Sequence, residues 1–69
     1  MNEKRAKLLL RRMHRSFTAG SILHLLSDLH REAGVKAAQA NDEKTCERHR
    51  AVEHALFVVG MGVDAALPT

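Results

Sequence analysis

The sequence predicts an all-α chain: an antiparallel helical hairpin with an additional basic N-terminal helix, completed by oligomerisation or by a partner chain. Three observations support this prediction. Apolar residues recur at steps of three and four, the period of an amphipathic helix, in three stretches of the 69 residues. Residues that favour turns separate these stretches. The chain is also short, so its core supplies little stability, and its single cysteine excludes an internal disulfide.

The N-terminal segment, residues 1–17, is predicted to form a basic amphipathic helix. Its apolar side follows steps of four, three and four through Ala6, Leu10, Met13 and Phe17. Residues 1–15 contain six Lys or Arg side chains and one acidic side chain, Glu3. This leaves a net charge of +5 there and −2 over the rest of the chain, so the basic character belongs to this segment.

A second helical stretch follows "TAGS", residues 18–21, where the apolar register slips. Gly20 costs a continuous helix about 1 kcal/mol relative to alanine, so we expect a kink or a break there. The apolar series then restarts with Ile22, Leu25, Leu26, Leu29 and Ala33. We expect the helical hairpin to occupy residues 21–66.

The chain is expected to reverse within residues 34–42. Gly34 follows a histidine and an arginine, which is typical of a helix C-terminus, although the residues after it favour helix strongly. Asn41 or Asp42 is expected to cap the last helix, with Glu43 in its first turn.

The last helix carries more apolar surface than one neighbouring helix can cover. One side presents the series Cys46, His49, Val52, Leu56, Val59 and Val63, and from Ala55 onward apolar residues surround the helix. Because the chain supplies one good partner helix, residues 21–38, the excess predicts an interface with another polypeptide. The predicted interface residues are Val52, Ala55, Leu56, Phe57, Val58, Val59 and Met61.

Two glycines in this helix leave an alternative open. Gly60 and Gly62 could allow the backbone of another chain to approach closely. Alternatively, the helix frays near Gly60, and the residues beyond it form a loose tail.

The residues that could carry chemistry are few. Cys46 and His49 lie one helical turn apart, and a hairpin could bring His30 close to His49, but no fourth ligand completes a zinc site. We therefore expect neither a metal nor another cofactor. Phosphate-binding loops, nucleophile–base pairs and paired carboxylates are absent from the sequence, so we do not expect an enzyme.

Neither a signal peptide nor a membrane span is expected, and an Arg-rich organelle presequence is an alternative for the basic N-terminus, where Glu3 is the one acidic residue before Asp28. The first apolar run is three leucines long, too short for a signal peptide, and the run 55–63 is too short to span a membrane. A lone cysteine is typical of a reducing compartment, so the expected location is the cytoplasm.

The N-terminal cations suggest a second kind of partner. Lys and Arg side chains along one side of a helix bind phosphates without sequence preference, or an anionic membrane surface. The alternative is a solvated arm without a ligand. The possible nucleic-acid contacts are Arg11, Arg12, Arg15 and Phe17. Base stacking is not expected, since the chain has two phenylalanines and neither tyrosine nor tryptophan.

The segment "RAVEHALFVV", residues 50–59, resembles the last helix of the small co-chaperones of the type III secretion needle subunit (the YscE/PscE type). The upstream "ILHLLSDLHRE" is similar in pattern to their preceding helix. The resemblance implies a helical hairpin that packs on a larger helical-repeat chaperone, and a complex that keeps the needle subunit from polymerising.

A second, looser resemblance concerns the plasmid repressor-of-primer proteins. The layout of "RRMHRSFTAGSILHLLSDL", basic residues followed by leucines, is similar to theirs. That resemblance implies a homodimeric four-helix bundle that binds RNA, with Arg12, Arg15 and Phe17 facing the RNA. A homodimer would cover the apolar surface equally well.

Overall fold

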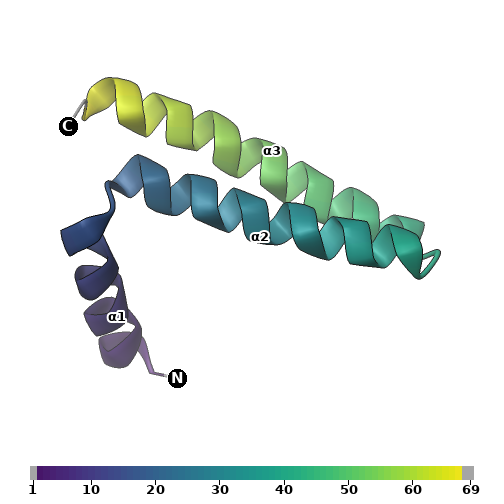
Figure 1. Ribbon diagram of the computed structural model, residues 1–69, viewed down its shortest axis with the longest axis horizontal. Coiled ribbons are helices and arrows are strands. Elements are labelled where there is room, and N and C mark those ends of the chain that lie inside the picture. The colour runs from purple at the N-terminus through teal and green to yellow at the C-terminus, as the bar shows by residue number, and fades with distance from the viewer. Residues whose placement is uncertain (1, 68–69) are drawn as a thin grey trace.

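The computed structural model describes residues 2–67, and these residues form three helices and no strand. Helix α1 spans Glu3–Ser16, α2 spans Ala19–Gln39 and α3 spans Glu43–Ala66. The predicted all-helical character is confirmed. Helices α2 and α3 lie side by side and run in opposite directions, whereas α1 projects away from the beginning of α2 (Figure 1).

The molecule is flat and extended. Its extents are 39, 30 and 16 Å, and the shortest is little more than the diameter of one helix with its side chains, about 10–12 Å. The radius of gyration is 14.0 Å, against about 11 Å for a compact domain of this length. A single layer of helices has no interior, and no large side chain among the described residues is fully buried.

The break between α1 and α2 lies at Phe17 and Thr18, both with extended backbone. The side chain of Thr18 caps α2 by accepting a hydrogen bond from the Ser21 N–H at 3.1 Å. Gly20 lies within the first turn of α2 and is buried, so the break precedes the glycine.

The connection between α2 and α3 depends on Asn41, which has a φ of 60°. Asparagine tolerates this left-handed conformation better than most residues. It allows the Asp42 N–H to donate to the Ala37 carbonyl at 2.9 Å and the Asn41 N–H to donate to the Ala38 carbonyl at 3.1 Å. These two bonds form a Schellman motif, which satisfies the last carbonyls of α2. Helix α2 therefore continues through Gly34 without ending there.

Asp42 caps α3, as expected from the sequence. Its carboxylate accepts hydrogen bonds from the Thr45 hydroxyl at 2.7 Å and the Thr45 N–H at 3.2 Å. Both bonds favour the ionised form, so they lower the pKa of Asp42 below its ordinary value. At the other end, α3 continues past Gly60 and Gly62 to Ala66, so the alternative of a helix that frays near Gly60 is excluded.

Candidate interaction surface

Small residues form the contact between α2 and α3. The buried residues of the two helices are Gly20, Ser27, Gly34, Ala37, Cys46 and Gly60. Three of them in α2 are spaced seven residues apart, which keeps them on one side of the helix. Ser27 adds a polar link, because its hydroxyl donates to the Glu53 carbonyl across the contact at 2.9 Å. Small side chains bring the helices together without burying large apolar groups.

The buried glycines make room for side chains of this same chain. A Cβ atom at Gly60 would lie 2.9 Å from Cε1 of His24, and a Cβ at Gly34 would lie 3.5 Å from the Cβ of His49. A Cβ at Gly62 would meet nothing within 4 Å. The interpretation of Gly60 as a site where another chain approaches is therefore wrong, since α2 already occupies that space.

Two histidines meet across the helix contact. The Nδ1 atoms of His30 and His49 are 3.0 Å apart, which confirms the expectation that the fold brings them together. In this hydrogen bond one imidazole donates and the other accepts. Cys46 is a buried free thiol one turn before His49. Within residues 2–67, however, no group of three or more His, Cys, Asp or Glu side chains is arranged to hold a metal ion.

One side of the α2–α3 pair is apolar. At 100° per residue, the helical period places two matching series there, each with steps of four, three and four. We define this apolar face as Ile22, Leu26, Leu29 and Ala33 of α2 with Val52, Leu56, Val59 and Val63 of α3. Two of its members are largely open to solvent, with Leu29 59% and Val59 54% exposed, whereas Ile22, Leu56 and Val63 are half-buried.

The opposite side of the pair, which we call the polar side, exposes the apolar Val35, Phe57 and Met61 but is also crossed by polar contacts. His24 Nε2 lies 3.2 Å from Oδ2 of Asp64, and the His24 ring packs on Phe57 with centroids 5.2 Å apart. Arg31 contacts Asp28 on its own helix, and its Nε lies 4.0 Å from Oε1 of Glu53 on α3. These contacts link α2 to α3 along this side of the pair.

The seven predicted interface residues do not share one surface. Val52, Leu56 and Val59 belong to the apolar face, but Phe57 packs on His24 on the polar side. The helical period places Met61 on the polar side as well. It turns Val58 and Ala55 outward, away from α2. The remainder of the apolar face, Val63 of α3 and the four residues of α2, was not among the predicted interface residues.

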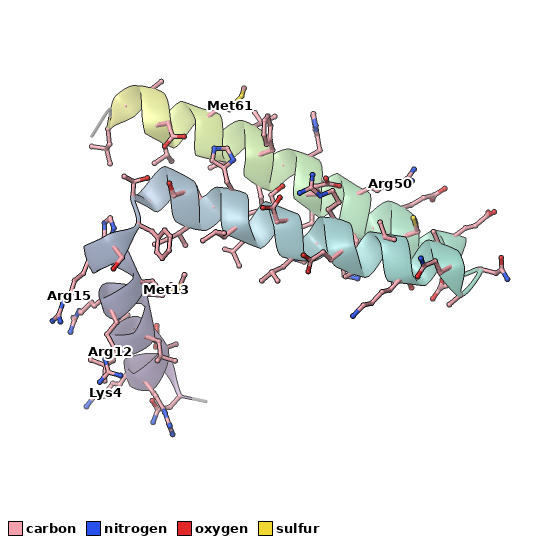
Figure 2. The ribbon with its side chains drawn as sticks, viewed as in Figure 1. Lys4, Arg12, Met13, Arg15, Arg50 and Met61 are labelled. Carbon is pink, nitrogen blue, oxygen red and sulfur yellow. The ribbon has the colours of Figure 1, made fainter. Side chains whose placement is uncertain are left out.

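Helix α1 forms a separate surface. It has no buried residue between Glu3 and Ser16, and it meets α2 near the Phe17–Thr18 break. Arg11, Arg12 and Arg15, three of the predicted nucleic-acid contacts, are exposed on α1. Figure 2 shows Lys4, Arg12 and Arg15 on the side of α1 that points away from the α2–α3 pair, and Met13 on the side toward it.

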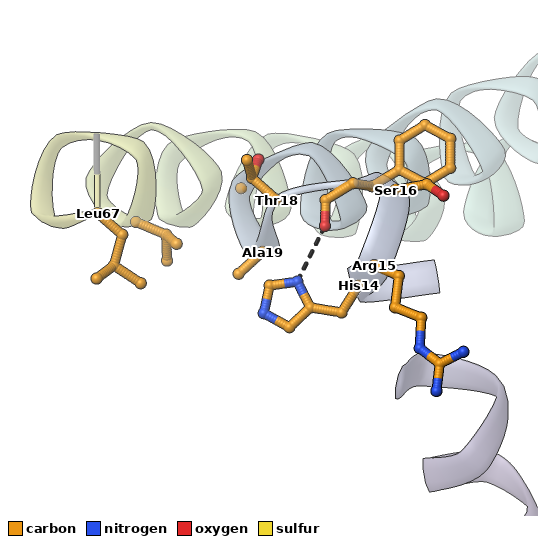
Figure 3. A pocket seen from close by; sticks show the side chains of 9 residues that line it. His14, Arg15, Ser16, Thr18, Ala19 and Leu67 are labelled. Carbon is orange, nitrogen blue, oxygen red and sulfur yellow. Dashed lines mark hydrogen bonds between the residues drawn. The ribbon is translucent and has the colours of Figure 1, made fainter. Parts of the chain in front are cut away.

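The junction of the three helices holds a depression of about 230 Å³ (Figure 3). It is lined by His14, Arg15, Ser16, Phe17, Thr18, Ala19, Gly20, Val63 and Leu67. Nδ1 of His14 is 2.9 Å from the Phe17 carbonyl oxygen and donates to it, which ties the end of α1 to the break. The polar side chains that line this depression, His14, Arg15, Ser16 and Thr18, are exposed.

Comparisons with known proteins identify no significant relative of this chain. No protein-family model matches the chain, and neither the curated proteins nor the solved structures include a significant match. Within residues 2–67, no helix combines the length and the apolar character needed to cross a bilayer.

Proposed function

We propose that this chain acts by binding, as a small assembly subunit whose apolar face packs against helices of another protein. The observation that supports this proposal is the pair of matching apolar series on α2 and α3, in which Leu26, Leu29, Val52 and Val59 are 40%, 59%, 41% and 54% exposed. A stripe of this period on each of two antiparallel helices is what a four-helix packing arrangement requires.

The partner that we propose is a larger helical chaperone, as in the needle co-chaperones of type III secretion that residues 50–59 resemble. In this proposal, the complex forms in the cytoplasm and keeps the needle subunit from polymerising. Three residues of the resembling segment, Val52, Leu56 and Val59, belong to the apolar face, so the segment would contribute directly to binding.

The test is co-expression with a helical-repeat needle chaperone from the same genome, followed by light scattering behind size-exclusion chromatography. We expect a stable complex of one copy of each chain. In the variant Val59→Asp the complex should be lost, with Kd raised at least about 100-fold, because binding would bury an unpaired carboxylate.

Val35→Asp is the matched control. Val35 is 52% exposed and Val59 is 54% exposed, but Val35 lies on the polar side of α2. This control should assemble normally. If both variants bound like the parent chain, the apolar face would not be the interface.

The matching series also favour a second candidate, a homodimer in which the apolar faces of two copies form the four-helix bundle. The face carries no charge, so two copies do not repel each other there. Light scattering on the chain expressed alone separates the two. A clean dimer that Val59→Asp converts to a monomer would favour the homodimer, whereas an aggregating or partly folded monomer would favour the chaperone complex.

A further inference from the structure

The cations of α1 are the largest concentration of charge in the molecule, and little within the chain neutralises them. Six of the eleven Lys and Arg side chains lie in residues 1–15. Among the described residues, α1 makes one ion pair, between Lys7 Nζ and Glu3 Oε1, and its length of 4.0 Å and exposed partners make it weak. The arginines of α1 have no acidic side chain within that distance.

The helical period arranges these cations along one side of α1. Lys4, Lys7, Arg11 and Arg15 follow steps of three, four and four, with Arg12 beside them. At 1.5 Å per residue, the row is about 16 Å long. We call these five side chains the cationic row.

The side of α1 on which the cationic row lies distinguishes a membrane surface from other polyanions as its binding partner. An amphipathic helix on a membrane must turn its apolar side outward, into the lipid. Here Met13 is on the side of α1 toward the α2–α3 pair, while Lys4, Arg12 and Arg15 point away from it (Figure 2). A flat bilayer that met the apolar side would collide with α2, whereas a polyanion can approach the cationic row unobstructed.

We propose that the cationic row binds the phosphate backbone of duplex nucleic acid, independently of whichever partner covers the apolar face. A duplex carries one negative charge per about 1.7 Å of axis, so a row of this length can engage about four phosphates. Single strands are disfavoured because recognition would need stacking aromatics, and Phe17, the phenylalanine near α1, lies at the junction with α2. Duplex RNA and duplex DNA share this chemistry.

The proposal predicts a strong dependence on salt. With about four phosphates neutralised, log Kobs should fall with log[salt] with a slope of about −3.6, which is a loss of about 100-fold between 50 and 200 mM salt. Binding should show little preference for base sequence, since the side chains contact phosphates alone.

The experiment is fluorescence anisotropy of labelled duplex RNA and duplex DNA, titrated with the whole chain over that range of salt. In the triple variant Arg11→Gln, Arg12→Gln, Arg15→Gln, glutamine maintains helix propensity and removes three charges. We expect the slope to become less steep by about 2 to 3 and the affinity at low salt to fall at least about 30-fold. The corresponding triple Arg→Lys variant should bind within about threefold of the parent chain, because it retains the charges.

The control variant removes the same charge from exposed positions on the α2–α3 pair: Lys36→Gln, Lys44→Gln, Arg50→Gln. It should bind within about threefold of the parent chain. An equal loss in this control would mean that net charge, and not the cationic row, drives binding, and would overturn the proposal. Vesicles of phosphatidylserine and phosphatidylcholine provide the last arm: binding to these vesicles without binding to either duplex would also overturn it.

These outcomes are distinct from those of the proposed function. The α1 variants leave the apolar face intact, so assembly with a protein partner should be unchanged. Val59→Asp, in turn, leaves the cationic row intact and should retain the slope of the salt dependence.

Discussion

At the scale of single residues, the hairpin depends on small side chains in the helix contact and on the residues that cap the helices. Large buried apolar side chains contribute less. Glycine at position 60 and serine at position 27 occupy places in the helix contact where larger side chains would separate α2 from α3. Asn41 and Asp42 then terminate one helix and begin the next within three residues. The consequence is that substitutions which look conservative at these positions should have large effects.

Gly60→Leu should destabilise the fold by about 1 to 3 kcal/mol, because a side chain there overlaps the His24 ring. Gly62→Leu is the matched control, since a side chain at position 62 enters open space. It should stabilise the helix by up to about 1 kcal/mol through helix propensity alone. Urea unfolding followed by circular dichroism measures both variants, and equal stabilities would contradict the helix contact described here.

The Asp42 cap should make stability depend on acid pH. Its pKa is lowered in the folded state by the hydrogen bonds from Thr45. Its contribution is therefore fully present above the ordinary carboxyl pKa and is lost as the pH falls through the folded-state pKa. In Thr45→Val the hydroxyl bond is absent, so thermal melts between pH 2 and about 5 should show a smaller acid loss. An unchanged pH profile in this variant would exclude the hydroxyl as the cause.

At the scale of helices, α2 and α3 each present two series. One includes the small buried residues of the helix contact, and the other consists of apolar residues, branched except for Ala33, and forms the apolar face. Because the contact consists of small residues, the hairpin buries little apolar area. Each Å² of buried apolar area contributes about 25 cal/mol to stability, so this contribution is small. The polar link from Ser27 to Glu53 should therefore account for a measurable share of the total.

Ser27→Ala should lower the free energy of unfolding by about 1 kcal/mol, since it removes a buried hydrogen bond at 2.9 Å. Ser16→Ala, at the exposed end of α1, is the control and should change it by less than about 0.5 kcal/mol. Chemical denaturation of both variants provides the comparison. If Ser27→Ala proved as stable as the control, the link would not contribute.

At the scale of the whole molecule, the two sides of the α2–α3 pair differ in what they leave unsatisfied. On the polar side, two polar contacts join the helices, Arg31 Nε with Glu53 Oε1 at 4.0 Å and His24 Nε2 with Asp64 Oδ2 at 3.2 Å. The apolar face has no such contacts, and several of its apolar side chains stay exposed because a single layer of helices has no further layer to cover them. Assembly should therefore depend on one side of the molecule and not on the other.

Leu26→Asp on α2 should abolish assembly as completely as Val59→Asp on α3, because both residues belong to the apolar face. Met61→Asp should leave assembly intact, although Met61 is 51% exposed and was among the predicted interface residues. Light scattering of the two variants with the partner, or alone for a homodimer, measures the difference. Loss of assembly in Met61→Asp would show that the interface extends to the polar side of α3.

The sequence by itself determined the helical class of this chain. Apolar residues at steps of three and four, in Leu10–Met13 as in Leu26–Leu29, identify helices because that period belongs to the local backbone. A cap of α3 at Asn41 or Asp42 was predictable for the same reason, since capping involves residues three positions apart, and the structure selects Asp42. The proximity of His30 and His49 needed one further assumption, an antiparallel pairing.

Tertiary structure alone decided which side of each helix faces its neighbour. The sequence series that contains Cys46, His49 and Val59 mixes residues of the helix contact with residues of the apolar face, because positions three and four apart are separated by only 40° to 60° around the helix. The register between α2 and α3 places Gly60 against His24 and turns Phe57 to the polar side. It also puts Leu26 and Val59 on the same face of the pair. That register is set by contacts 20 to 40 residues apart in the chain, such as His24 with Asp64, and local periodicity carries no information about them.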